Sequence, residues 1–279
     1  MAEVDVIVPV LDGGQRFAAC VRALQAQEGV DRRVIVVDNG SSDGSADVAR
    51  RAGVIVVEEP RRSSYAARNA GLAVATAPVV AFTDADCVPD PQWLLAGLGA
   101  LERGGWHLCA GEVRQEPAST VAGRHDELTY LRQDVQVRNM GFGATANLFV
   151  RRAVFDVVGP FDASLQSGGD LDLGRRARAA GFALGYAPDA LVLHEPREGL
   201  RRVLGKAWRL GVGQAQVGRH DPSLRRWGLS PRRLLPGPDL VRRSWRRPAV
   251  LVVEVLVKAT GWVARVVTVA GIAGRGPRR

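Results

Sequence analysis

The N-terminal half of the chain alternates between short apolar runs and polar, glycine-rich turns. The apolar runs are rich in valine and predict strands at 4–9, 34–37, 54–57 and 79–82, of which the first and last are expected to be buried. Apolar residues at helical spacing lie between them, at Phe17, Cys20, Val21 and Leu24, and predict a helix there; a further helix is expected over 65–75. Strand, polar turn and helix in succession are typical of a parallel sheet whose loops gather at one edge. The pattern therefore predicts an α/β fold.

Two aspartates, Asp84 and Asp86, follow the strand expected at 79–82. In an open α/β sheet this end of a strand is where ligands bind, and side chains two residues apart point the same way in an extended chain. A pair of carboxylates suits a hard divalent cation that also carries a phosphate. The same aspartates could instead cap the helix expected to begin near Pro91. The pair alone leaves both interpretations open.

Two common nucleotide-binding motifs do not occur in the sequence. No G-x-G-x-x-G follows the first expected strand. The segment 199–206 departs from a P-loop because its glycine spacing is off by one and Ala207 stands where Ser or Thr belongs. These departures exclude the dinucleotide dehydrogenases and the P-loop NTPases.

Five further segments occur in a characteristic order along the chain. They are IVPVLDGG (7–14), VVDNGSSDGS (36–45), ARNAGL (67–72), GATANLFVRRAVFDVVGPFD (143–162) and GGDLDLGRRARAAGFALGYAPDALVLH (168–194). Together with the D-A-D stretch they resemble the family 2 glycosyltransferases, which are nucleotide-sugar enzymes with the GT-A fold. The resemblance implies a GT-A domain over 1–196, with a mostly parallel sheet flanked by helices. It also implies inverting transfer of a sugar from a nucleotide-sugar donor, expected to be UDP-linked, to a saccharide or lipid-linked acceptor.

The resemblance implies donor-binding roles for residues in the first three turns. Asp38 is expected to accept a hydrogen bond from the nucleobase, although it could instead form an Asx turn. Arg68 and Asn69 are expected near the diphosphate, with a solvated helix face as the alternative. Pro9 and Asp12 fall where the family has P-x-Y-N, but this chain reads P-V-L-D. Leu11 and Asp12 thus replace the family's Tyr and Asn, and this difference leaves the identity of the bound base open.

The resemblance also implies a metal site for Mg²⁺ or Mn²⁺. It assigns Asp84 to the neighbourhood of the ribose and the metal, and Asp86 to direct ligation. His194 follows the Pro188-Asp189 segment, and some similar enzymes use a histidine there as a further ligand. The alternative for His194 is a structural histidine at the end of a strand.

Asp170, in the segment GGDLD, aligns with the general base of similar enzymes. Gly169 stands where the family usually has Glu, and this difference affects the expected acceptor contacts. A carboxylate at the start of a helix could instead be an N-cap. Asp172 can fill that electrostatic role, which leaves Asp170 available for chemistry.

Net charge is +9 and is unevenly distributed, because the chain from Arg197 onward holds 19 Lys and Arg against 4 Asp and Glu. A basic extension behind an acidic catalytic part indicates an anionic membrane surface as partner and no nucleic acid. Within this extension (197–279), a helix over 249–274 would gather Glu254, Lys258 and Arg265 on one stripe, opposite valines and leucines. We expect this helix to lie on a membrane with the stripe at the headgroups, or to pack on the catalytic domain with the stripe to water.

Three scattered cysteines, Cys20, Cys87 and Cys109, form no metal spacing and no disulfide framework, which indicates a reducing compartment. Glu3 and Asp5 stand where an export signal would carry basic residues. The expected location is cytoplasmic, peripheral on the inner face of the plasma membrane. Two alternative functions stay open: a nucleotidyltransferase of similar fold, and a non-catalytic protein that binds nucleotide-sugar or membrane.

Overall fold

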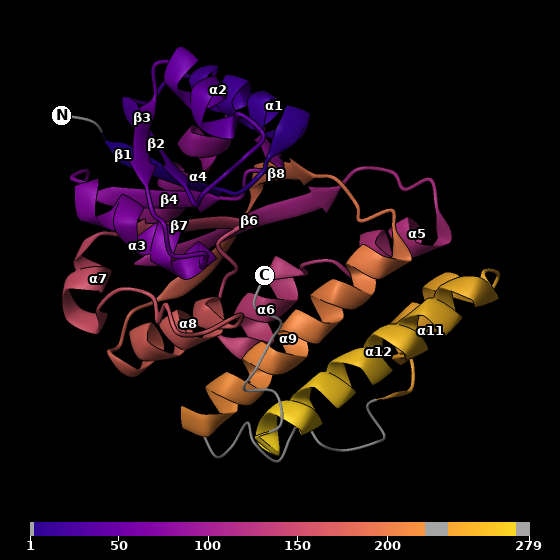
Figure 1. Ribbon diagram of the computed structural model, residues 1–279. Coiled ribbons are helices and arrows are strands. Elements are labelled where there is room, and N and C mark those ends of the chain that lie inside the picture. The colour runs from indigo at the N-terminus through magenta and orange to yellow at the C-terminus, as the bar shows by residue number, and fades with distance from the viewer. Residues whose placement is uncertain (1–2, 221–233, 272–279) are drawn as a thin grey trace. The chain divides into compact units, whose positions relative to one another are not determined.

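The computed structural model describes residues 3–220 and 234–271 (Figure 1). Its contacts divide the chain into two compact units. The sheet unit comprises 1–114, 131–163 and 170–195, and the helical unit comprises 115–130, 164–169 and 196–279. The helical unit therefore contains the basic extension together with two segments from the middle of the chain. The proposed boundary between a 1–196 domain and a 197–279 extension stays a prediction.

The sheet unit is built on one sheet of eight strands in the order β3-β2-β1-β4-β7-β6-β8-β5. The strands are β1 (Val4–Val10), β2 (Arg32–Asp38), β3 (Ile55–Glu58), β4 (Val79–Thr83), β5 (Cys87–Pro89), β6 (Leu108–Gln115), β7 (Asn147–Arg151) and β8 (Leu184–His194). Strands β3, β2, β1 and β4 are parallel, whereas β7 pairs antiparallel with both β4 and β6, and β5 pairs antiparallel with β8. The expected α/β fold is confirmed. Its sheet is mixed, because the parallel arrangement ends at β4.

Seven helices accompany this sheet in the described part of the chain. They are α1 (Gly14–Gln25), α2 (Ser45–Arg51), α3 (Ser64–Val74), α4 (Trp93–Gly104), α6 (Gln133–Met140), α7 (Ala153–Val158) and α8 (Gly169–Ala179). The four strands and two helices expected from the apolar pattern are all present, with ends that differ by a few residues. Glycines allow two helices to approach the sheet closely. A Cβ on Gly71 of α3 would collide with Ile7, and one on Gly97 of α4 would collide with the ring of Phe149.

The two faces of the sheet carry different layers of helices. Phe82 is in register with Ile7, and its ring lies 6.1 Å from that of Phe155 in α7, so α3 and α7 cover the same face. Ala81 is in register with Phe149, which packs against α4 on the opposite face. Successive side chains of each strand point to opposite faces of the sheet and so contribute to two separate apolar layers. Buried strands of this kind hold their ends at fixed positions, which is what a ligand site requires.

The helical unit contains α5 (Val121–Thr129), α9 (Leu200–His220), α11 (Pro238–Ser244) and α12 (Pro248–Val269). Helix α12 packs along α9 and against α5 (Figure 1). Helices α9 and α12 approach closely because Gly211 of α9 faces Gly261 of α12. A Cβ on Gly211 would collide with the carbonyl oxygen of Gly261. A small apolar core of Ala122, Val203 and Val253 joins the three helices.

The charged stripe of α12 faces the inside of the helical unit. Glu254 is 8% exposed, its Oε2 lies 2.7 Å from Nε2 of His125 on α5, and its Oε1 lies 3.2 Å from Nζ of Lys258. The expectation that the stripe meets headgroups or water is therefore wrong for Glu254. The reason is that His125 supplies a buried partner, which the pattern of α12 alone does not reveal. Residues 272–274 of the expected helix lie outside the described residues.

A second polar cluster of the helical unit centres on Asp126. Its Oδ1 lies 2.9 Å from Nζ of Lys206 and its Oδ2 lies 3.3 Å from Nη1 of Arg197, and the Lys206 amine lies 4.1 Å from the ring centroid of Tyr130. Burial would raise the pKa of Asp126, but the two cations outweigh it and bring this pKa to about 2. The cluster ties α5 to the start of α9.

Candidate active site

The loops after β1 and β2 are joined by hydrogen bonds at the carboxyl edge of the parallel strands, where Val10 and Asp38 are in register. The backbone N–H of Asp12 donates to Oγ of Ser41 at 3.0 Å, and the backbone N–H of Ser42 donates to Oδ1 of Asp12 at 2.7 Å. The N–H of Gly14 also donates to Asp43 Oδ2, at 2.8 Å. Asp12 has a φ of 50°, in the left-handed region that Asp tolerates better than most residues. The two loops therefore form one connected unit at the sheet edge.

Asp38 and Pro9, both expected near the nucleotide, lie at this edge. Asp38 is the last residue of β2, is buried, and its Oδ1 accepts a hydrogen bond from the N–H of Ser41 at 3.1 Å. This contact is the turn-forming role considered as the alternative for Asp38. Pro9 is part of β1, in register with Val37. The base-binding role of both residues stays a prediction.

Arg68 reaches from α3 to the aspartates that follow β4. Ser63 caps this helix by accepting a hydrogen bond from the N–H of Ala66. Arg68 is 5% exposed, and its Nη2 lies 2.6 Å from Oδ1 of Asp84. Its other amino group, Nη1, donates to the carbonyl oxygen of Ser64 at 3.3 Å. The arginine is thus buried beside Asp84, which rules out the solvated helix face considered for it.

Asn69, the neighbour of Arg68, makes two hydrogen bonds with the backbone of Phe161. Its Nδ2 donates to the carbonyl oxygen at 2.8 Å and its Oδ1 accepts from the N–H at 3.0 Å. These bonds fix the loop after α7 against α3. The proposed contact of Asn69 with the donor stays a prediction, because the structure gives its amide a role in the fold.

Asp86 and His194 meet although they are far apart in the sequence. Pairing of β5 with β8 places Cys87 opposite His194, and Nε2 of this histidine lies 3.1 Å from Oδ2 of Asp86. His194 is 1% exposed, whereas the side chain of Asp86 is 48% exposed. Arg16 of α1 donates to the carbonyl oxygen of Asp86 at 3.3 Å and so helps to fix this turn. Two of the expected metal ligands are therefore adjacent.

The chemistry of these side chains fits a divalent metal. Carboxylate oxygens suit Mg²⁺ and Mn²⁺, and an imidazole beside them is a ligand that Mn²⁺ accepts more readily than Mg²⁺. Within residues 3–220 and 234–271, no three His, Cys, Asp or Glu side chains gather closely enough to hold a metal ion by themselves. Asp86 and His194 would supply two of the several ligands that such an ion takes.

Asp170 lies in the first turn of α8, after Gly168, whose φ of 88° favours glycine. Its Oδ1 accepts a hydrogen bond from Oγ1 of Thr145 at 3.0 Å. Burial raises the pKa of Asp170 above its ordinary value; Arg68 and Thr145 counteract this increase, and the charge of Asp84 adds to it. A carboxyl with a raised pKa accepts a proton more readily near neutral pH, as a general base requires.

Asp172, two residues further on, has a different environment. Its Oδ2 lies 2.8 Å from Nε of Arg176, one turn along the same helix. Arg176 in turn donates to the backbone carbonyls of Val158, Gly159 and Pro160. Asp172 therefore anchors α8 to the loop after α7, and Asp170 is the aspartate of this helix that lies near Arg68 and Asp84.

Thr145 and Arg16 complete the site but were given no role by the sequence analysis. Thr145 lies in the segment GATANLF, which helped to carry the family resemblance, and its polar side chain in an apolar run was a usable signal. Arg16 belongs to α1, where the apolar pattern identifies only the buried face. Below the site lie two buried thiols, Cys20 and Cys87. Burial and the nearby carboxylates raise the pKa of both, so they stay protonated.

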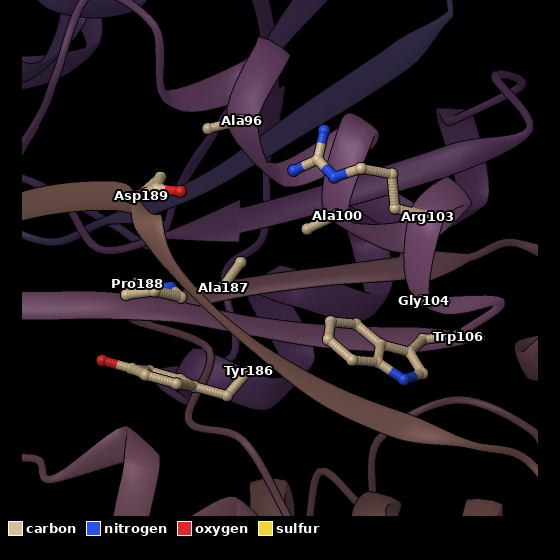
Figure 2. A pocket seen from close by; sticks show the side chains of 9 residues that line it. All are labelled: Ala96, Ala100, Arg103, Gly104, Trp106, Tyr186, Ala187, Pro188 and Asp189. Carbon is tan, nitrogen blue, oxygen red and sulfur yellow. The ribbon is translucent and has the colours of Figure 1, made fainter.

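A cavity of about 280 Å³ lies elsewhere on the sheet unit, between α4 and β8 (Figure 2). Arg103 and Trp106 line one side of it, and Tyr186, Pro188 and Asp189 of β8 line the other. Tyr186 donates its hydroxyl to a carboxylate oxygen of Glu112. None of the residues expected to bind donor, metal or acceptor lines this cavity, so it is separate from the candidate active site.

The fold agrees with that of solved glycosyltransferases. The mannosyltransferase PcManGT from Pyrobaculum calidifontis, in complex with GDP-Man and Mn²⁺, shares 17% identity at a TM-score of 0.61, over 99% of this chain and 76% of that protein. Glucosyl-3-phosphoglycerate synthase from Mycobacterium tuberculosis, in complex with Mn²⁺, UDP-glucose and phosphoglyceric acid, shares 21% identity at a TM-score of 0.53, over 72% of this chain and 74% of that one. A mixed sheet with carboxylates gathered at the ends of its strands thus defines a GT-A fold.

Sequence comparison identifies the family. Residues 5–161 match the family described as Glycosyl transferase family 2. The glycosyltransferase AglE from Haloferax volcanii is 35% identical over 96% of this chain and 94% of that protein. The chain belongs to glycosyl transferase family 2 and is a glycosyltransferase, as the resemblance implied.

Proposed function

We propose that the chain is an inverting glycosyltransferase that moves a sugar from a UDP-linked donor to a hydroxyl of a lipid-linked or cell-envelope saccharide. The observation that carries this proposal is the grouping of Asp170, Arg68 and Asp84 beside the pair formed by Asp86 and His194. A general base, a buried cation and a carboxylate–imidazole pair are the groups that such a reaction requires. Related structures hold UDP-glucose in one case and GDP-mannose in another, so the choice of UDP belongs to the proposal.

In the reaction, Asp170 accepts the proton of the acceptor hydroxyl through the oxygen that Thr145 does not occupy. The hydroxyl oxygen forms its bond to the anomeric carbon on the face opposite the diphosphate. The bond from that carbon to the phosphate oxygen breaks and its electron pair leaves with the nucleoside diphosphate. The configuration of the sugar is therefore inverted. Thr145 orients the carboxyl, so only one of its oxygens faces the acceptor.

Asp86 and His194, assisted by Asp84, would hold the Mg²⁺ or Mn²⁺ ion, which supplies positive charge to the departing diphosphate. The nearby Arg68 holds the carboxylate of Asp84 in position at 2.6 Å. Burial of His194 restrains its ring, because a side chain that is 1% exposed has little freedom to rotate. These residues bind and orient the diphosphate end of the donor, and the loops after β1 and β2, which contain Asp12 and Asp38, receive its nucleoside.

The location of the enzyme is part of the same proposal. Among the described helices, none is both long enough and apolar enough to cross a membrane. We place the enzyme peripherally on the cytoplasmic face of the plasma membrane, where a lipid-linked acceptor would be within reach. The basic residues of the extension support this placement, since anionic lipid attracts Lys and Arg near its surface.

Donor hydrolysis tests the proposed function. The purified chain is incubated with Mn²⁺ and a panel of UDP-, GDP-, dTDP- and CMP-sugars, and release of the nucleotide is measured with and without EDTA. We expect slow release of UDP from one or a few UDP-sugars, and no release with EDTA. Release from a GDP-sugar alone would reassign the base, and no release or binding of any donor would overturn the proposal.

A further inference from the structure

The outward face of helix α12 is apolar along its length. At about 100° per residue, Val252, Val255, Leu256 and Val263 project to the side opposite the buried residues Val250, Val253 and Glu254. Val252 is 59% exposed, and the other three are each more than 40% exposed. Ala259 and Val266, which lie on the same side of the helix, are partly exposed and apolar, whereas Lys258 is partly exposed beside Glu254, away from this side. A contiguous apolar face of this kind indicates an interaction surface.

The charges of α12 do not reach this face. Glu254 is buried between His125 of α5 and Lys258, at 2.7 and 3.2 Å. The pKa of Glu254 would be raised by burial, but these two partners lower it below its ordinary value. Because the helix satisfies its carboxylate inside the unit, the outward face can enter an apolar phase without carrying a charge into it.

A group of arginines and an exposed tryptophan precede the apolar face. Arg242, Arg243, Arg246 and Arg247 are all exposed, and Trp245 is 67% exposed with the guanidinium of Arg246 lying 4.6 Å from its ring centroid. The first turn of α12 holds no acidic residue. Arg242 and Arg243 lie in the last turn of α11, where the helix dipole favours cations, but Arg246 and Arg247 directly precede α12, where its dipole disfavours them, so these two need another explanation. Anionic headgroups provide one, and an indole beside arginine is typical of a membrane interface.

We propose that the outward face of α12, together with Trp245 and the four arginines before it, is a docking surface for an anionic lipid bilayer. Helix α12 lies in the plane of the interface with Val252, Leu256 and Val263 among the acyl chains, and the arginines contact the headgroups. The charge of this surface favours lipid, because its apolar part is bordered by cations. The inference deepens the peripheral location proposed above and does not depend on the role of Asp170.

Flotation of the full chain with liposomes tests this surface. The vesicles contain either phosphatidylcholine alone or phosphatidylcholine with phosphatidylglycerol at a ratio of about 3:1. Only the second kind is anionic and attracts Arg. We expect flotation with the anionic vesicles and release by high salt. The triple variant V252E/L256E/V263E is expected to lose binding by more than tenfold. The double variant R242Q/R246Q is expected to lose roughly 25-fold on anionic vesicles, since each surface cation changes binding by about fivefold.

The matched control is V74E/L95E/V157E, which adds three carboxylates to exposed apolar positions of the sheet unit. This control is expected to float like the unaltered chain. Circular dichroism and Mn²⁺-dependent UDP binding verify that each variant is folded. Flotation requires no donor, so the two proposals can fail separately. If the unaltered chain floats but does not bind UDP, the proposed function is refuted and the membrane-docking surface is not.

Three results would overturn the proposal. The first is failure of the unaltered chain to float with anionic vesicles. The second is flotation of V252E/L256E/V263E at the level of the control. The third is evidence that a second copy of the chain, and not lipid, covers this face. In that case sedimentation velocity without lipid would show a dimer of the unaltered chain and a monomer of the triple variant, and the triple variant would float as well as the unaltered chain.

Discussion

The buried guanidinium of Arg68 lies 2.6 Å from the carboxylate of Asp84, which is partly exposed at the carboxyl edge of the sheet. The ion pair ties α3 to the turn after β4. It also leaves Asp86, two residues on, as the more exposed of the two aspartates, at 48% against 33% for the side chains. The two carboxylates of the D-A-D stretch therefore have different surroundings: Asp84 pairs with Arg68, whereas Asp86 lies beside His194 and is more exposed to solvent.

We predict that Asp86→Ala abolishes Mn²⁺-dependent binding of UDP, while Asp84→Ala weakens it less. Removing the exposed carboxylate takes away the ligand nearest to His194, whereas Asp84 already shares its charge with Arg68. Isothermal titration calorimetry with and without EDTA measures the effect. Asp156→Ala, at an exposed carboxylate of α7, serves as the control and should bind like the unaltered chain. Equal affinity in all these proteins, with or without EDTA, would refute the metal site.

We predict that Asp170→Asn retains donor binding but lowers the rate of sugar transfer by about 10²- to 10⁴-fold, because the amide keeps the shape and loses the proton acceptor. Asp172→Asn should affect the rate less and stability more, because it breaks the pair with Arg176. Single-turnover transfer assays and thermal unfolding separate the two effects. The reverse order of rates would assign the base to Asp172.

We predict that Thr145→Val moves the acid limb of the kcat/KM profile to higher pH. The hydroxyl of Thr145 lowers the pKa of Asp170, so its loss lets burial raise this pKa further and protonates the base at a higher pH. Thr145→Ser keeps the hydrogen bond and should restore the original profile. An unchanged acid limb in Thr145→Val would show that another group controls it.

We predict that Asp126→Asn destabilises the helical unit by about 2 kcal/mol at pH 7, since a pKa lowered from 3.8 to about 2 corresponds to a free energy of this size. A lowered carboxyl pKa contributes stability above pH 3.8, and the contribution disappears as the pH falls through about 2. Urea unfolding at several pH values, followed by far-ultraviolet circular dichroism, measures this difference. Asp239→Asn, at an exposed pair with Arg242, should change stability by much less. Equal stability of Asp126→Asn and the unaltered chain at neutral pH would contradict the prediction.

The strands and helices of the parallel half could be predicted because most of these strands bury a continuous apolar run and α1 buries a regularly spaced apolar face. The β4 segment is an example: Val79, Val80, Ala81 and Phe82 are all buried, and the turn that follows carries the aspartates. The antiparallel half was not predicted in detail, because pairing of β5 with β8 joins residues more than a hundred positions apart. The contact of Asp86 with His194 depends on that pairing.

The candidate site could be located from the sequence where a residue belongs to a motif, as Asp84, Asp86 and Asp170 do; their roles stay predictions. It was not predictable where a residue acts through a distant partner. Thr145 gains its role only because α8 brings Asp170 to it, and Glu254 is buried only because α5 presents His125. Helical periodicity shows which residues share a face, but it cannot show which other helix covers that face.

The hydrogen bonds between the loops after β1 and β2 make these two loops, the proposed nucleoside site, one rigid unit. Asp12 holds Ser42 and Asp43 holds Gly14, so an altered residue in one loop moves the other. If these loops receive the nucleoside as proposed, a change of donor base requires coordinated substitutions in both loops, and single changes lower affinity for every donor before they alter preference. Anyone who wishes to retarget this enzyme should exchange residues 11–14 and 39–45 together, as one cassette.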